Sequence, residues 1–367
     1  MTSPASSGPA SSAPASSIYA PRPGKLRGTL VGCGFFAENH LNAWTLMRDT
    51  PLEGVELVAV CDKDVGKAEA AARRFGVPHV YADAEAMLAE QKPDFVDIAT
   101  TLPSHRALVE LAARHGVPAI CQKPFAASLE DAEAMVRACA EAGVQLMVHE
   151  NFRWQHPLLA VKQALDEGWA GRPFFGRVQF RHGFDIITNQ PYLAEDERYI
   201  IMDVGLHLLD VARFLFGEAG RLYCRTARID PRVRGEDTAT MLVDFHAGVT
   251  GVVDLSTATR TEPEPFPECL VRIEGNDGTI DLEQGYRLVL SRPGHREVRP
   301  VDAELLPWAA RPWHVVQDSV LAIQRHWVDC LREGREPDTS GADNLRTLEL
   351  TFGAYRSAET GEAVAFG

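Results

Sequence analysis

The chain has 367 residues, which exceeds the size at which a single hydrophobic core usually keeps growing, so two domains are expected. Its formal net charge of -14 argues against nucleic acid and anionic membranes as partners, because both attract basic surfaces. A small, largely uncharged ligand is favoured instead.

The cysteines and the N-terminal segment indicate where the protein works. The seven cysteines are widely spaced and form no C-x-x-C pair, a pattern that indicates a reducing compartment, here the cytoplasm, and no zinc site. No apolar run approaches the ~20 residues that a membrane-spanning helix needs. Residues 1–24 are mainly Ser, Ala, Pro and Gly and lack the apolar segment of a secretory signal, so we expect a disordered tail.

Between residues 25 and 149, short apolar runs alternate with alanine-rich stretches of helical spacing. Five runs are expected to be buried parallel strands: Gly28–Val31, Leu57–Cys61, Phe95–Ala99, Ala119–Cys121 and Leu146–Val148. Three stretches are expected to be helices, each followed by a glycine suited to a left-handed C-cap: Lys67–Phe75, Arg106–His115 and Leu129–Ala142. This alternation predicts an α/β first domain with a doubly wound parallel sheet.

Residues 150–367 show a different pattern, in which strands dominate after two helices. The helices are predicted over Pro157–Glu167 and Tyr199–Phe216. The predicted strands are Leu222–Ile229, Ala239–Phe245, Val249–Ser256, Cys269–Glu274, Thr279–Glu283 and Arg287–Leu290. Asn276-Asp277-Gly278 is the clearest hairpin turn, and two last helices are expected over Val315–Arg332 and Asp343–Ser357. We therefore expect a second α/β domain built on an open, mostly antiparallel sheet.

A glycine-rich loop follows the first predicted strand and opens a helix. Residues 32–37 read Gly-Cys-Gly-Phe-Phe-Ala, a G-x-G-x-x-A pattern. Gly32 allows the tight turn, Gly34 lets the backbone approach a pyrophosphate, and the small Ala37 permits close helix packing. The helix N-terminus then offers amide donors to phosphates. An incidental glycine turn is the alternative when the loop is taken alone.

An acidic residue ends the second apolar run. Asp62 can accept hydrogen bonds from the adenosine ribose hydroxyls and would repel a 2′-phosphate, so NAD is favoured over NADP. The adjacent Lys63 weakens that discrimination, and NADP stays open.

Lys123 directly follows the fifth expected strand, together with Pro124. In an open α/β sheet, ligands bind outside the carboxyl ends of the strands. The ammonium group could therefore hydrogen-bond a reacting oxygen and lower the pKa of a substrate hydroxyl. An exposed lysine at the end of a strand is the alternative.

Asp203 and His207 are four residues apart, so both side chains share one face of the predicted helix. Asp210 falls on the same face and could orient the imidazole. Gly205 inside the helix costs ~1 kcal/mol relative to Ala, which suggests that a ring of a ligand packs against bare backbone there. A histidine is the natural general base for an alcohol proton. The alternative is a satisfied histidine in the core.

Together these motifs resemble the Gfo/Idh/MocA oxidoreductases over essentially everything from Lys25 to the C-terminus. The matching segments are Gly32–Ala37, Val58–Asp62, Asp97–His105, Lys123-Pro124, Asp203–Asp210, Glu236–Thr238 and Ser357–Gly361. The resemblance implies a Rossmann domain over 25–149, a C-terminal α/β domain over 150–367 with an open sheet often used for oligomerisation, and an NAD(P) site between them.

The resemblance also assigns roles to residues. It implies that Lys123, Asp203 and His207 are the catalytic lysine, aspartate and histidine, and no metal is expected. The cofactor contacts implied are Gly32, Gly34, Phe35, Phe36, Ala37, Asp62, Thr100, Pro103, His105, Gln122 and Lys123. The family usually has Glu where this chain has Gln122, which puts the electrostatics around the lysine and the choice of cofactor in question.

Two segments narrow the resemblance. Residues Cys33–His40 and His149–Gln155 look like those of family members that oxidise D-apiose to its lactone. Such a resemblance implies a small polyhydroxylated substrate.

Polar side chains are expected at the edge of a cleft for such a substrate. Glu150, Asn151 and Arg153 follow the last strand of the first domain and enter the second. A hinge with polar surface residues is the alternative. Asp185, with Asn189 and Gln190 in the same loop, is a further candidate for substrate binding, beside Asp203 and His207.

Three functions follow from these residues. In the leading one, hydride passes from a sugar or cyclitol carbon to nicotinamide, His207 takes the proton, and Lys123 and Asp203 orient and polarise the oxygen. The alternatives are NAD-dependent glycoside cleavage through transient oxidation and a non-catalytic dinucleotide sensor. A homodimer or homotetramer is expected, because antiparallel sheets invite self-association.

Overall fold

The computed structural model of the protein describes residues 24–50, 54–188 and 190–367. The tail expected over 1–24, apart from Gly24, lies outside the described residues, as does Asn189.

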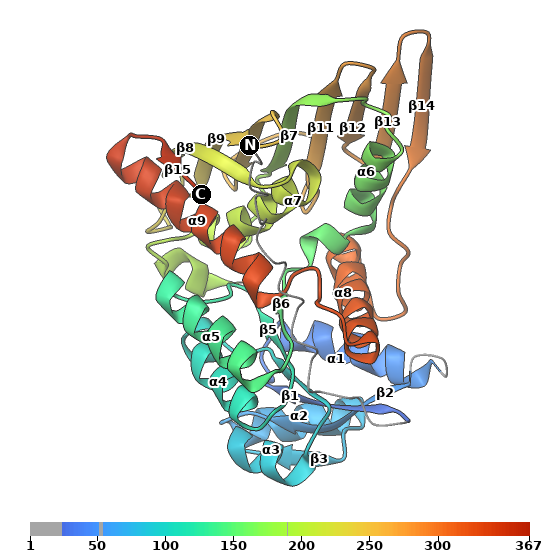
Figure 1. Ribbon diagram of the computed structural model, residues 1–367, viewed down its shortest axis with the longest axis vertical. Helices are drawn as coiled ribbons and strands as arrows, with labels where there is room; N and C mark the ends of the chain where they lie inside the picture. The colour runs from blue at the N-terminus through green and yellow to red at the C-terminus, as the bar shows by residue number, and fades with distance from the viewer. Residues whose placement is uncertain (1–23, 51–53, 189) are drawn as a thin grey trace, which may run out of the picture.

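The first sheet has six parallel strands in the order β3-β2-β1-β4-β5-β6 (Figure 1). The strands are β1 (Leu26–Val31), β2 (Val55–Cys61), β3 (His79–Tyr81), β4 (Phe95–Ile98), β5 (Ala119–Gln122) and β6 (Leu146–His149). Its helices are α1 (Ala37–Asp49), α2 (Val65–Phe75), α3 (Ala84–Gln91), η1 (Leu102–Ser104), α4 (His105–Arg114) and α5 (Leu129–Ala142). All five predicted strands are present, whereas β3 and α3 were not predicted. The strand order reverses between β1 and β4, the point at which sheets of this kind bind ligands outside the carboxyl ends of their strands.

Local signals set the ends of these helices. Asp64 caps α2 by accepting from the amides of Gly66 and Lys67. The glycines expected to end helices adopt left-handed conformations, with φ of 67° at Gly76 and 66° at Gly116. Each turn then leads directly toward the next strand of the sheet.

The second sheet has nine strands in the order β14-β13-β12-β11-β7-β10-β9-β8-β15. The strands are β7 (Pro173–Arg181), β8 (Ala219–Ala227), β9 (Thr238–Phe245), β10 (Thr250–Ser256), β11 (Leu270–Gly275), β12 (Thr279–Glu283), β13 (Arg287–Arg292), β14 (His295–Pro300) and β15 (Val364–Ala365). The predicted hairpin turn joins β11 to β12. Pairing is antiparallel except between β7 and β10, which run parallel. The α/β fold class with a mostly antiparallel second sheet is thus confirmed.

Helices lie between and beside the two sheets (Figure 1). They are η2 (Phe152–Trp154), α6 (His156–Asp166), η3 (Pro191–Glu195), η4 (Ile201–Gly205), α7 (Leu206–Phe216), α8 (His314–Glu333) and α9 (Gly341–Thr360). The helix predicted over Tyr199–Phe216 is therefore divided: η4 is a turn of π-helix, and α7 continues from it. Asp203 lies in the π-turn and His207 in α7.

The last two long helices pack back on the first sheet. Six side chains of α8, among them Trp327, belong to the core that also contains Leu30 and Phe95 of the first sheet. Leu348 of α9 joins the core on the other side, with Ile98 of β4. The first sheet is therefore enclosed partly by residues that come late in the chain.

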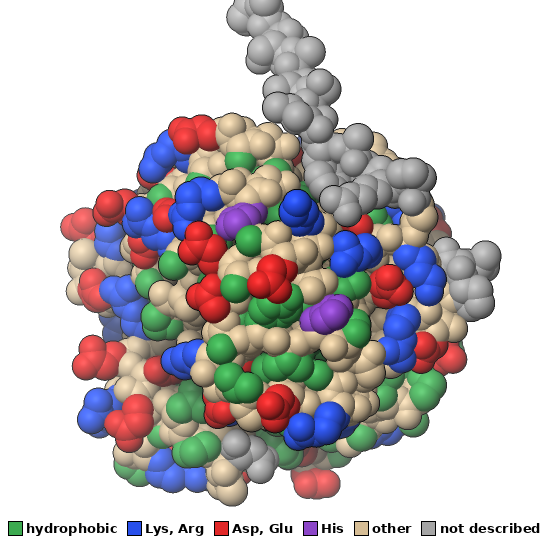
Figure 2. Space-filling view, turned by 90° about the horizontal axis from the view of Figure 1, so that it is seen from below, with side chains coloured by type: hydrophobic (Ala, Val, Ile, Leu, Met, Phe, Trp, Pro, Cys, Tyr) green, Lys and Arg blue, Asp and Glu red, His purple; other side chains and the backbone are tan. Residues whose placement is uncertain are grey.

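Figure 2 shows the end of the molecule formed by the first sheet and its helices, where acidic, basic and hydrophobic side chains are interspersed. Among the described residues, no helix has the length and apolar character needed to cross a membrane.

Candidate active site

In the glycine loop after β1, the backbone is exposed at Gly34 and tightly packed at Gly32. Gly32 has φ of +95°, and a Cβ there would lie 2.7 Å from the carbonyl oxygen of Ala99, so the turn requires glycine. Gly34 is exposed, and a Cβ there would meet nothing within 4 Å. Ala37 is buried where α1 begins. The loop therefore offers bare backbone beside a helix N-terminus, as a pyrophosphate requires.

Asp62 lies at this loop, as the motif predicts. Its carboxylate accepts a hydrogen bond from the amide of Cys33 at 2.8 Å and another from the amide of Asp64 at 2.9 Å. A carboxylate at the carboxyl end of β2, beside the glycine turn, fits the ribose of a dinucleotide. Phe35 is 78% exposed in the glycine loop, and Phe36 contacts the buried His40 edge-on. The described residues thus fit NAD at the carboxyl edge of the first sheet.

The loop after β4 lies across from the glycine turn. Thr100 is within reach of Gly32, since a Cβ on that glycine would lie 2.8 Å from its methyl group. Pro103 is exposed in η1. The ring of His105, by contrast, is buried between backbone carbonyls: Nε2 lies 3.1 Å from the oxygen of Thr100 and Nδ1 3.0 Å from that of Pro124. Because both nitrogens face protein, we withdraw His105 from the cofactor contacts; it holds two loops together.

Lys123 and Asp203 meet as predicted. The Lys123 ammonium donates to the Asp203 carboxylate at 2.9 Å and to its backbone carbonyl at 2.8 Å. The lysine side chain is 19% exposed and the aspartate side chain 28%. The pair joins the end of β5 to η4, residues eighty positions apart, and remains accessible to a small molecule.

Gln122 supports the backbone of Lys123. Its amide oxygen accepts from the Lys123 amide at 2.6 Å, and its Nε2 lies 3.3 Å from Nε2 of His40. His40 in turn bonds the buried carboxylate of Asp97. Both ends of the Gln122 amide are therefore engaged inside the protein, so we withdraw it from the direct cofactor contacts.

His207 is held by Glu150, not by Asp210 as predicted. Its Nδ1 contacts the carboxyl oxygen Oε1 of Glu150, and its ring stacks on Phe152 with centroids 4.0 Å apart. Asp210 is instead bonded to the Arg153 guanidinium, at 2.7 Å from Nε. Asp210 does lie one helix turn after His207, but its carboxylate binds the guanidinium instead of the imidazole. Glu150 therefore orients the imidazole.

Burial shifts the pKa values of Glu150 and His207. Removal from solvent raises the pKa of Glu150 to about 8, with Lys123 and Arg153 opposing the rise. Burial, and then the positive charge of Lys123, lower the pKa of His207 well below its usual value. Both groups therefore favour their neutral forms. The effect of Lys123 on both pKa values also places its charge near the imidazole.

Two expected substrate contacts are engaged elsewhere. Arg153 is buried, and its nitrogens bond Asp210, Asp343 and the carbonyl of Asp338. The Asn151 amide nitrogen donates to the hydroxyl of Ser319 on α8. Their polar groups stabilise helix contacts, and we withdraw both from the substrate-binding set. The sequence could not reveal this, because their partners lie far along the chain.

The loop after β7 approaches the site. Asp185 is exposed and bonds Thr188 and Arg232, so its role in substrate binding stays a prediction. Tyr192, which was not predicted, is 61% exposed in η3. Partial burial and then the negative charge of Asp203 raise the pKa of Tyr192 to about 12, which places the phenol near the aspartate. An aromatic ring in an exposed polar loop was the only signal in the sequence.

Gly205 has a different explanation from the predicted one. A Cβ there would lie 3.4 Å from side-chain carbons of Leu255 and Ile201, so protein packs against this glycine. The expectation of a ligand ring at this position is wrong. Within residues 24–50, 54–188 and 190–367, no three His, Cys, Asp or Glu side chains gather in a way that could hold a metal ion.

Comparison with known proteins identifies the family. Residues 26–150 match the model of an oxidoreductase family with an NAD-binding Rossmann fold, and residues 158–281 match the GFO/IDH/MocA C-terminal domain. The chain is 53% identical to the D-apiose dehydrogenase of Rhizobium rhizogenes over 343 residues, 94% of this chain and 98% of that protein. It is also 53% identical to the D-apiose dehydrogenase of Paraburkholderia graminis, over 93% of this chain and 89% of that one.

A solved structure shares this fold over most of the chain. The oxidoreductase from Agrobacterium radiobacter, in complex with NAD+, L-tartaric acid and magnesium, superposes with a TM-score of 0.90. It is 53% identical and covers 93% of this chain and 98% of its own. The chain belongs to the Gfo/Idh/MocA oxidoreductases, and the expectation of an NAD-dependent oxidoreductase acting on sugar hydroxyls is confirmed.

Proposed function

We propose that this protein oxidises D-apiose to its lactone with NAD as the hydride acceptor. The observation that supports this most directly is the ion pair of Lys123 and Asp203 at the end of β5, with His207 on the following helix turn, at the cofactor edge of the first sheet. The 53% identity to two D-apiose dehydrogenases supports the choice of sugar.

The chemistry needs one proton acceptor and one oxygen-polarising group. In a cyclic aldose, loss of hydride from the anomeric carbon and of a proton from its hydroxyl gives a lactone and breaks no other bond. NAD, when bound, supplies the site that accepts the hydride. His207 removes the proton through Nε2, while the Lys123 ammonium stabilises the negative charge that develops on the oxygen. Asp203 holds the ammonium in place.

The cofactor side and the substrate side come from different parts of the chain. We propose residues 25–149 as the dinucleotide domain and 150–367 as the substrate and oligomerisation domain. The end of β6 at His149, directly before η2, supports this boundary. Gly32, Gly34, Phe35, Phe36, Ala37, Asp62, Thr100, Pro103 and Lys123 are the cofactor contacts proposed.

We further infer that the protein works in the cytoplasm as a homodimer or homotetramer. Seven free cysteines, six of them buried, suit a reducing compartment. An open sheet of nine strands offers a face for self-association. Light scattering of the purified protein measures the oligomer directly.

The function is tested by following NADH formation with D-apiose, D-xylose, D-glucose and an inositol. D-Apiose is expected to give the highest kcat/KM and a lactone product. Lys123→Met, which keeps the aliphatic stem, is expected to lower kcat roughly 100-fold or more. Lys162→Met is the control, since its ammonium bonds Asp166 and lies over the ring of Phe214, and has no described contact with the candidate active site.

The same assay distinguishes the alternatives. Release of an aglycone from glycosides without net NADH would indicate glycoside cleavage instead. Tight NAD binding without turnover of any sugar would indicate a dinucleotide sensor, and either result would overturn the proposal.

A further inference from the structure

The first turn of the helix that carries Asp203 is capped by two side chains from distant elements. The leading amides of a helix have no partner within the helix. Here the amide of Ile200 donates to the backbone oxygen of Glu236 at 3.0 Å, and that of Ile201 to its carboxylate at 3.1 Å. The amide of Met202 donates to the Tyr355 hydroxyl at 3.1 Å. Three consecutive amides are thus satisfied from outside the helix.

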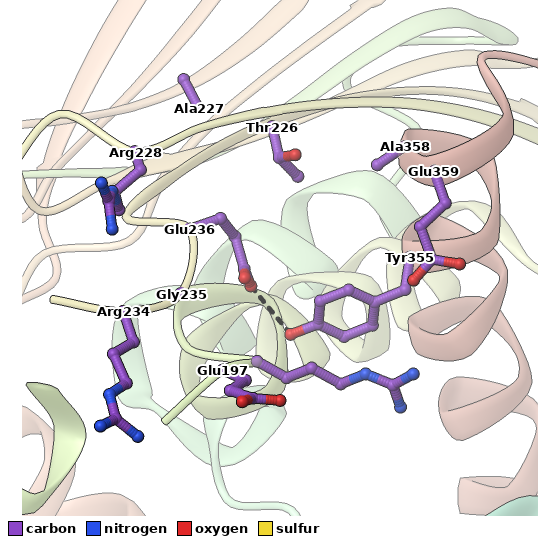
Figure 3. Close-up of a pocket in the computed structure, with 11 residues that line it drawn as sticks. Glu197, Thr226, Ala227, Arg228, Arg234, Gly235, Glu236, Tyr355, Ala358 and Glu359 are labelled. Carbon is purple, nitrogen blue, oxygen red and sulfur yellow. Dashed lines mark hydrogen bonds between the residues drawn. The ribbon is translucent and has the colours of Figure 1, made fainter. Parts of the chain in front are cut away.

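The two capping groups are tied to each other. The Tyr355 hydroxyl donates to the Glu236 carboxylate at 2.8 Å, and the two side chains point toward one another across a pocket (Figure 3). This pocket has a volume of about 630 Å³, and its described lining includes neither Lys123 nor Asp203. The pair therefore reaches the first turn from outside the candidate active site.

The loop that carries Glu236 is fixed tightly against the turn. A Cβ at Gly235 would lie 2.7 Å from the carbonyl oxygen of Asp196 and 2.9 Å from the amide of Tyr199, so only glycine allows this approach. Buried Asp237 accepts from the amides at the other end of the loop, Ile229 and Asp230. The carboxylate of Glu236 is consequently held at the positive end of the helix, where a negative charge is favourable.

Asp203 follows the capped amides directly. Both of its acceptors, the carboxylate and the backbone carbonyl, bind the Lys123 ammonium. The carbonyl belongs to the helix backbone, so any shift of the first turn displaces the lysine as well. The cap, the aspartate and the lysine form one continuous set of hydrogen bonds.

We propose that Glu236 and Tyr355 are positioning residues. By capping the turn that carries Asp203, they fix the position of the Lys123 ammonium. The expected loss of kcat rests on the proposed function. The expected loosening of the helix turn rests on the hydrogen bonds alone. Neither residue needs to touch the sugar or the cofactor.

The test compares Tyr355→Phe with Tyr81→Phe in the full-length protein. Tyr81 is a matched control, because its hydroxyl also donates to a glutamate, Glu90, and accepts from an amide nitrogen, that of Gln91. In Tyr355→Phe, hydrogen exchange of the peptide over residues 199–207 is expected to accelerate about tenfold, the equivalent of one lost hydrogen bond. In Tyr81→Phe that peptide is expected to exchange as in the wild type.

The kinetic arm separates positioning from stability. Tyr355→Phe is expected to lower kcat roughly 10-fold to 100-fold while the Kd for NAD stays within twofold. Glu236→Gln keeps an acceptor oxygen and is expected to retain more activity than Glu236→Ala. A lowered melting temperature with unchanged kcat would show a purely structural role and overturn the proposal.

The exchange arm needs no sugar, so it remains decisive if the proposed substrate is wrong. Wild-type protein that reduces no NAD would count against the proposed function only. Unchanged exchange over residues 199–207 in Tyr355→Phe would count against the cap itself.

Discussion

One proton on the pair of Glu150 and His207 decides whether the imidazole can act as a base. A neutral imidazole has one donor and one acceptor nitrogen. When Glu150 is protonated, it donates to Nδ1, and the ring hydrogen then lies on Nε2. When Glu150 is ionised, it accepts from Nδ1, and the lone pair of Nε2 is free. Because the pKa of Glu150 is raised to about 8, the form competent to remove a proton increases as the pH rises.

This leads to a pH-dependence prediction. In the wild type, kcat/KM for sugar oxidation is expected to rise between about pH 7 and pH 9, with an apparent pKa near that of the pair. Glu150→Gln has no proton to lose, so its profile should be flat in this range and its kcat roughly 100-fold lower. Asp281→Asn, another carboxyl whose pKa is raised by burial, is the control and should keep the wild-type profile. An unchanged rise in Glu150→Gln would contradict the assignment.

A second prediction concerns the two neighbouring aspartates after β2. Asp62→Asn removes the charge at the ribose site, so the preference for NAD over NADP should fall on the order of tenfold, measured as the ratio of kcat/KM values. Asp64→Asn, the matched control, changes only the cap of α2 and should leave this ratio unaltered. Equal NAD-to-NADP ratios of kcat/KM in the wild type and Asp62→Asn would show that Asp62 does not contact the 2′-hydroxyl of the adenosine ribose.

At the scale of elements, α7 is fixed by a buried ion pair rather than by packing alone. Asp210 is fully buried and bonds Arg153 of η2 and the hydroxyl of Thr347 on α9. Asp343 at the start of α9 binds the same guanidinium. Three elements are thereby held in one arrangement around His207.

Removing the cation from this network should be costly. Arg153→Met leaves the buried Asp210 carboxylate with only the Thr347 hydroxyl and the more distant Arg213 guanidinium, at 3.9 Å, so the free energy of unfolding should fall by about 3–5 kcal/mol in urea titrations. Arg106→Met, which breaks solvent-exposed pairs with Glu110 and Asp131, should cost no more than about 1 kcal/mol for each pair. The KM for sugar should be unchanged in the folded fraction of Arg153→Met. A large rise in KM would return Arg153 to the substrate-binding set.

At the scale of the whole molecule, α8 lies beside α1 and completes the cover of one face of the first sheet (Figure 1). Trp327 is fully buried there, with its ring edge-on to Phe95 of β4 at a centroid distance of 6.5 Å. On the opposite face, α9 packs against α5. The two sheets therefore share helices, and we expect them to unfold together.

Trp327→Ala tests this coupling. The cavity should lower the free energy of unfolding by about 3–5 kcal/mol, in one transition seen by both circular dichroism and NADH-binding signals. Leu305→Ala, at an exposed position, should change it by about 0.5 kcal/mol or less. Two separate transitions in Trp327→Ala would show that the sheets unfold independently.

The first sheet was largely predictable because its strands are continuous apolar runs. β3 was missed since two of its three residues are exposed. β7 lies at the centre of the second sheet but was not predicted, because Pro173 and Gly176 are atypical of a central strand. Gly176 is required there because a Cβ would overlap the ring of Phe216. Packing of this kind leaves no local signal.

In the site, the features that depend on short-range sequence patterns were predicted. Those that depend on competition between residues far apart in the sequence were not. Strand ends placed Lys123 and helix spacing placed Asp203 beside His207, and the resemblance implied that all three belong to one site. The exchange of partners between Glu150 and Asp210 could not be foreseen. Arg153 follows Glu150 closely and Asp210 follows His207 closely in sequence, whereas each actual partner lies 57 positions away. Which carboxylate faces the imidazole is decided by the guanidinium that binds the other one.

The packing of α8 on the first sheet has a consequence for synthesis on the ribosome. The strands β1 to β6 leave the exit tunnel first, and α1 covers part of one face of them with side chains such as Trp44. The six α8 side chains that complete this core arrive only with residues 314–333. At typical translation rates that interval is on the order of ten seconds. During it this apolar face is covered only in part, so we expect the growing chain to depend on chaperones that bind exposed apolar surfaces.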